Sequence, residues 1–83
     1  IGTMRMTARP NPVTDRCEIT FSEPVGTGAV LVLTDVTGRT QRNILGNGTR
    51  TITIERGTLS AGVYHARLID HGQYGPGLHL VLR

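Results

Sequence analysis

The sequence predicts an all-β fold, and three observations lead to this prediction. Short runs rich in Val, Ile, Leu and Thr are separated by Gly, Asn and Pro, the residues that favour turns. No window places apolar residues at helical spacing over three turns. The 83 residues include one Phe, two Tyr and no Trp, so the core must consist mainly of Val, Ile and Leu. A chain of this length forms one domain.

Turn signals divide the chain into seven expected strands. Pro10 and Pro12 end the first strand, because proline fixes φ and lacks a backbone donor. Asp15 is expected to cap the following turn by accepting a backbone N–H. In the second strand, Cys-x-Ile-x-Phe at 17–21 alternates with polar residues and should point inward. We expect strands at residues 3–8, 16–22, 29–34, 39–45, 49–55, 62–69 and 78–83, with the whole chain, 1–83, as a single domain.

The middle of the chain predicts one central strand and two tight turns. The continuous apolar run at 30–33 suits a central strand that is covered on both faces, or one whose outer face packs on a neighbour. Asp35 and Gly38 stand first and last in a type I turn. Asn47-Gly48 is the strongest hairpin signal, because both residues accept positive φ. We therefore expect the strands on either side of Asn47-Gly48 to form a hairpin.

The segment before the sixth strand has the layout of a tyrosine corner. Gly62 permits a sharp turn, and Tyr64 follows at the start of the strand. The tyrosine ring should pack in the core while its hydroxyl reaches the backbone just upstream. We expect a loop at 70–77, and the leucines of 78–83 should share one face of the last strand. Seven short strands with turns about every 8–12 residues predict an immunoglobulin-like β-sandwich, antiparallel and Greek-key.

Charge and cysteine content exclude several classes of protein. The nine basic residues are all Arg, scattered among six acids for a net charge of +3, whereas a nucleic-acid binder shows a basic stripe with interleaved aromatics. Cys17 is the single cysteine, so it forms no internal disulfide and is expected in the core. No apolar run is long enough for membrane insertion, and no signal peptide is recognisable. Because the chain begins at Ile1 rather than Met, we expect a piece of a longer polypeptide.

No motif for catalysis or cofactor binding emerges. His65, His71 and His79 are too far apart in sequence to resemble a zinc box. The aspartates stand at turns or strand ends, where Asp caps the backbone, so a paired-carboxylate hydrolase is not indicated. No Ser lies in a nucleophile elbow, and the glycines at 26–28 lack the Lys of a phosphate loop. We expect no catalytic residue, no cofactor, no metal ligand and no enzyme activity.

The order of the motifs resembles a known family. Pro10-Asn11-Pro12, with Asp15 close behind, precedes the alternating strand, and Leu-x-x-Gly-x-Tyr at 59–64 comes late in the chain. At this separation the two motifs resemble the type A C-terminal sorting domain of the type IX (Por) secretion system, over roughly residues 4–83. The chain departs from the family pattern at Arg9, where an aromatic residue is common, and in having no Lys near its end.

The resemblance implies a non-catalytic delivery signal. Family members stand at the C-terminus of proteins that cross the inner membrane by an N-terminal signal and are then recognised by an outer-membrane translocon. A sortase typically cuts on the N-terminal side of the domain and can attach the cargo to surface lipopolysaccharide. The implied partners are the translocon, the sortase and an upstream cargo domain, with no nucleic acid. The implied location is the cell surface or the medium, reached through the periplasm of a two-membrane bacterium. The family motif falls on Pro10, Asn11, Pro12, Asp15, Gly38, Gly62, Tyr64, Leu80, Val81, Leu82 and Arg83.

The last strand is the expected docking element. Its leucines are too apolar for a free tail, so we expect this strand and its neighbouring edge to bind a partner by strand addition. Two other functions remain open. One is a carbohydrate-binding or fibronectin-like accessory module of a secreted enzyme, with Tyr74 as the obvious exposed aromatic residue. The other is a structural sandwich that binds a partner through a self-complementary edge.

Overall fold

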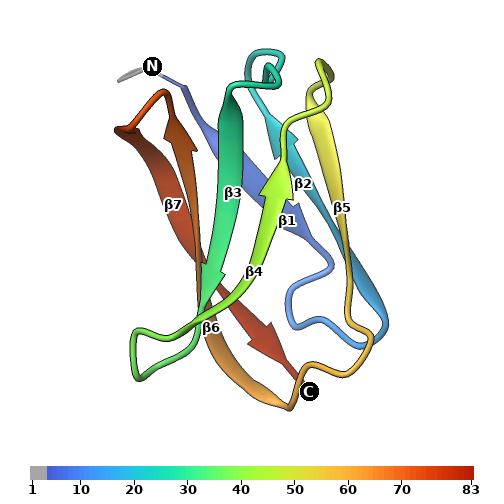
Figure 1. Ribbon diagram of the computed structural model, residues 1–83. Helices are drawn as coiled ribbons and strands as arrows, with labels where there is room; N and C mark the ends of the chain where they lie inside the picture. Colours follow the sequence, from blue (N-terminus) through green and yellow to red (C-terminus); the bar gives the residue numbers. More distant parts are fainter. Residues whose placement is uncertain (1–3) are drawn as a thin grey trace.

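The computed structural model describes residues 4–83, which form two β-sheets packed face to face (Figure 1). The three-stranded sheet has the order β1-β2-β5 and the four-stranded sheet the order β4-β3-β6-β7, with antiparallel pairing throughout. This confirms the predicted all-β, immunoglobulin-like sandwich. No helix in this part of the chain could cross a membrane. The strands are β1 (Met6–Arg9), β2 (Arg16–Phe21), β3 (Ala29–Thr34), β4 (Thr40–Leu45), β5 (Thr51–Glu55), β6 (Gly62–Asp70) and β7 (Gln73–Leu82).

The core lies between the two sheets. It consists of the inward-facing side chains of strands in which buried positions alternate with more exposed ones. In β2, Cys17, Ile19 and Phe21 are buried while the residues between them are exposed, as the sequence pattern predicts. β3 lies between β4 and β6, which confirms its predicted central position. Within residues 4–83 no charged or polar side chain is buried. The other buried side chains are Val13, Val25, Ala29, Leu31, Leu33, Ile52, Ile54, Tyr64, Ala66, Leu68, Leu80 and Leu82.

The hairpin predicted at Asn47-Gly48 is wrong, because β4 and β5 lie in different sheets. Only Gly48 takes the positive φ that the hairpin turn was expected to need at both residues, with a value of 82°. The Gly48 N–H donates to the Val25 carbonyl (2.7 Å), and the Val25 N–H donates to the Thr49 carbonyl (2.8 Å). The turn therefore pairs with the loop after β2 and carries the chain across the sandwich. Turn residues specify a bend, whereas the burial of apolar side chains decides which strand becomes the partner.

The loop predicted at 70–77 is also wrong, because β7 begins at Gln73, which pairs with Asp70. Only His71 and Gly72 form the turn, with φ values of 51° and 81°. Such two-residue turns with positive φ match the twist of a hairpin. Pro76 lies within β7, which tolerates a proline because it is an edge strand, where a residue that faces away from the neighbouring strand needs no N–H for the ladder. The first expected strand is shorter than predicted, and its residue Thr3 lies outside the described residues.

Candidate functional site

The motif residues gather at one end of the sandwich, the lower end in Figure 1. Gly62 pairs with Leu82 at the start of β6, and Val13 forms a parallel bridge with the same leucine. The β3–β4 turn, which contains Gly38, lies at this end because β3 finishes where β6 starts, at the pair Thr34–His65. We call this region the motif end: segments 10–15, 35–39 and 56–64, and residues 79–83.

Asn11 ties the Pro-Asn-Pro segment to the last strand. Its Nδ2 donates to the carbonyl of His79 (2.9 Å), and its Oδ1 accepts from the N–H of Val81 (2.9 Å). The side-chain amide thus presents one donor and one acceptor to the outer edge of β7, as the backbone of a neighbouring strand would. The flanking prolines, both preceded by cis peptide bonds, offer no N–H of their own.

Val13 continues the same pairing. Its N–H donates to the carbonyl of Val81 (2.7 Å), and its carbonyl accepts from the N–H of Arg83 (3.0 Å). The Val13 side chain is buried in the core. The outer edge of β7 over residues 79–83 is therefore occupied by the chain itself. The expectation that this edge is free for strand addition is corrected by these contacts.

Tyr64 forms the predicted tyrosine corner. Its ring is buried, and its hydroxyl donates to the carbonyl of Ser60 (2.7 Å). Gly62, with a φ of 152°, adopts a backbone conformation that is strained for other residues. The bond fixes the β5–β6 connection against the start of β6.

The turn at Asp35 to Gly38 has the predicted geometry. Gly38 has a φ of 84°, and its N–H donates to the Asp35 carbonyl (3.0 Å). The Asp35 carboxylate accepts from the Thr37 hydroxyl (2.6 Å) and from the N–H groups of Thr37 and Arg39. These hydrogen bonds, that of the Thr37 hydroxyl foremost, lower the pKa of Asp35. The turn therefore carries a negative charge at neutral pH.

Arg56 is a residue of the motif end that the sequence analysis missed. Its Nε donates to the Leu59 carbonyl (3.1 Å), and its Nη1 donates to the carbonyls of Thr14 (3.1 Å) and Arg83. One guanidinium thus joins the β5–β6 connection, the segment before β2 and the end of β7. Nothing in the sequence around Arg56 indicates these contacts, because the three carbonyls come from separate segments that are brought together only by the fold.

Asp15 contacts Arg56 through its main chain, because its carbonyl accepts from the Arg56 N–H (2.9 Å). The predicted capping by its side chain does not appear among the hydrogen bonds of residues 4–83, which corrects that expectation. Of the four terminal motif residues, Leu80 and Leu82 are 1% and 4% exposed, whereas Val81 and Arg83 face solvent. The terminal motif thus divides into two core residues and two surface residues.

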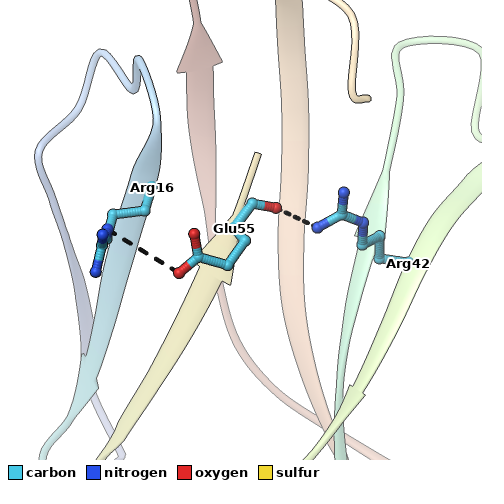
Figure 2. Close-up of polar contacts among 3 residues, drawn as sticks. All are labelled: Arg16, Arg42 and Glu55. Carbon is cyan, nitrogen blue, oxygen red and sulfur yellow. Dashed lines mark hydrogen bonds and ion pairs between the residues drawn. The ribbon is translucent and has the colours of Figure 1, made fainter. Parts of the chain in front are cut away.

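Arg42 closes the side of the sandwich between β4 and β5. Its guanidinium donates to the carbonyl of Glu55 and to that of Arg56 (2.8 Å), as Figure 2 shows for Glu55. The Glu55 carboxylate points away from Arg42 toward Arg16, at 4.0 Å from its Nε. Both side chains of this ion pair are largely exposed, so the pair contributes at most about 1 kcal/mol.

Chemistry-bearing residues elsewhere take structural positions. Cys17 is fully buried, and burial raises the pKa of its thiol, which suits the predicted core role rather than a reactive one. Within residues 4–83 no group of three or more His, Cys, Asp or Glu side chains could hold a metal ion. Tyr74 is 73% exposed, but the Arg67 guanidinium lies 5.6 Å from its ring centroid. The guanidinium therefore covers part of this exposed ring.

Comparison with known proteins adds one family. A family model described as a secretion system C-terminal sorting domain matches residues 8–74. The match includes the Pro-Asn-Pro segment, Gly38 and the Gly62–Tyr64 corner, and it ends before the terminal residues 80–83. No curated protein matches the chain. Because the model covers most of the 83 residues, the chain belongs to the family of C-terminal sorting domains, the secretion signals of the type IX system.

Proposed function

We propose that the type IX machinery of the outer membrane recognises the motif end as a folded surface, after the attached cargo has entered the periplasm. In this proposal the domain is a non-catalytic sorting signal. The translocon binds it, a sortase cuts on its N-terminal side, and the cargo reaches the cell surface or the medium. Membership of the sorting-domain family supports this proposal.

The observation that carries the folded-surface proposal is the pairing of segment 11–13 with residues 79–83. Asn11 and Val13 bond to the main chain of His79, Val81 and Arg83. The two segments are far apart in the sequence, but the fold brings them together, so a partner that binds this surface contacts both. A partner that added a strand to β7 over residues 79–83 would first have to displace Asn11 and Val13.

The test separates the surface of β7 from its buried side. Val81 is 40% exposed and Leu80 is 1% exposed, although the two are adjacent. A reporter with an inner-membrane export signal, fused before the chain, is expressed in a bacterium with a type IX system. We expect Val81→Glu to retain the reporter in the periplasm while the melting temperature of the domain changes little. Leu80→Ala should reduce export only through unfolding, and a lower growth temperature should restore export.

Leu45→Glu is the matched control, since Leu45 is a 69% exposed aliphatic residue on the other edge strand of the same sheet, at the far end. It should leave export unchanged. Equal export of Val81→Glu and Leu45→Glu, both folded, would contradict recognition of the motif end.

A further inference from the structure

Two histidines face each other on the outer surface of the four-stranded sheet. His65 in β6 pairs directly with His79 in β7, and their ring centroids are 5.1 Å apart with an interplanar angle of 57°. The His79 carbonyl and the Val81 N–H both bond to Asn11, on the outer edge of β7. His65 and His79 therefore form a non-hydrogen-bonded pair, the kind in which opposite side chains of an antiparallel ladder lie closest together.

This arrangement suits a metal ion. Two imidazoles that bind one tetrahedral ion through Zn–N bonds of about 2.1 Å place their ring centroids about 5 Å apart. We infer that His65 and His79 form a two-histidine site for a divalent transition metal that prefers imidazole nitrogen, such as Zn²⁺. Water completes the coordination, because the pair borders an open surface hollow of about 360 Å³.

The charges around the pair determine how well it holds a cation. Burial, then Arg67 and His79, lower the pKa of His65, so its imidazole is neutral at neutral pH, the form that binds metal. Arg67 opposes a bound cation, but its Nη1 is directed to the Gly75 carbonyl (3.2 Å) and its guanidinium to the Tyr74 ring. The ionised Asp35 lines the same hollow as the two histidines and offsets part of this positive charge.

The absence of a side chain at Gly77 makes room for the His65 ring. A Cβ at this position would lie 2.9 Å from His65 Nε2, closer than side-chain atoms pack. The space that a side chain at this position would fill is occupied by the His65 ring and by the Arg67 guanidinium, whose Nη2 would lie 3.2 Å from such a Cβ. A metal ion bound here would connect β6 to β7 next to the motif end and would stabilise the pairing of the last strand.

The test is titration of the 83-residue chain with Zn²⁺ alone at neutral pH, by isothermal titration calorimetry and by NMR of the imidazole nitrogens. We expect one ion per chain, with resonance shifts at His65 and His79. Either His65→Gln or His79→Gln should weaken binding by at least about tenfold, since two tethered ligands bind far more tightly than one. His71→Gln is the control: the side chain of His71 is 81% exposed in the β6–β7 turn and contacts Asp70 (2.7 Å).

The NMR readout on the unmodified chain does not depend on whether a variant folds. Shifts confined to His71, equal affinity of His65→Gln and the unmodified chain, or no saturable binding of Zn²⁺ would overturn the inference. Unchanged binding in His71→Gln, together with loss in both other variants, would support it.

Discussion

Asn11 offers the sharpest stability test of how the motif end is held together. Asn11→Ala removes the donor to the His79 carbonyl and the acceptor for the Val81 N–H, both at 2.9 Å. Each neutral hydrogen bond contributes about 0.5–1.5 kcal/mol net. Because Asn11 is exposed and water can replace its bonds, we expect a total loss of about 1–2 kcal/mol in the free energy of unfolding.

This loss converts into a measurable change in melting temperature. For a chain of 83 residues, 1 kcal/mol corresponds to roughly 6 °C, from an unfolding entropy of about 2 cal/mol/K per residue. Asn11→Ala should therefore lower the melting temperature by about 6–12 °C in a calorimetric or circular dichroism scan. Hydrogen exchange gives a second, local readout, since the Val81 amide should lose protection.

Two further variants make the Asn11 result specific. Asn11→Asp keeps an acceptor for Val81 but places a negative oxygen against the His79 carbonyl, so it should be at least as destabilising as Ala. Asn43→Ala, at an exposed position on β4, should change the melting temperature by less than about 3 °C. If Asn11→Ala had the same melting temperature as the unmodified chain and the Val81 amide kept its protection from hydrogen exchange, the stabilising role of the Asn11 hydrogen bonds would be refuted.

Three more predictions address the corner, the arginine and the pH dependence. Tyr64→Phe loses the 2.7 Å bond to Ser60 and should lower the free energy of unfolding by about 1 kcal/mol in urea titration; an unchanged midpoint would deny the corner a stabilising role. Arg56→Gln breaks the guanidinium contacts to Leu59, Thr14 and Arg83 and should cost about 1–3 kcal/mol, with faster exchange at the Arg83 amide; if only the β5–β6 connection loosened, the joining role would be wrong. Because the pKa of His65 is lowered in the folded chain, the unfolded chain binds more protons as pH falls through about 6.5, and stability decreases there. His65→Gln should show a smaller decrease in melting temperature between neutral and acidic pH, and an identical pH profile would count against this assignment.

The features that the sequence predicted correctly are local in origin. Inward residues at 17, 19 and 21 follow from two-residue alternation, and Tyr64 follows from its spacing to Gly62. The apolar run of β3 indicated its central position, although its outward Val30 and Val32 are only half-buried. Each of these features depends on residues within a single strand or turn, which is the range over which a sequence pattern carries structural information.

The features that the sequence did not predict depend on pairing between distant segments. Asn47-Gly48 specified a bend but not the strand that pairs with β5. Pro76 argued against a strand at 73–77, but β7 is an edge strand, and an edge strand tolerates a proline. The amide of Asn11 reaches Val81 across 70 residues, and His65 meets His79 only through the register of β6 and β7. Such contacts cannot be predicted from a sequence pattern, because they depend on how distant segments pair in the fold.

The most direct test of a sorting role is the location of a reporter that carries this chain at its C-terminus. The reporter has an inner-membrane export signal and is expressed in a bacterium with a type IX system, and its amounts in the periplasm, on the cell surface and in the medium are determined. We expect the reporter to leave the periplasm when the chain is attached and to remain there when it is absent. Equal amounts outside the cell with and without the chain would contradict its role as a sorting signal.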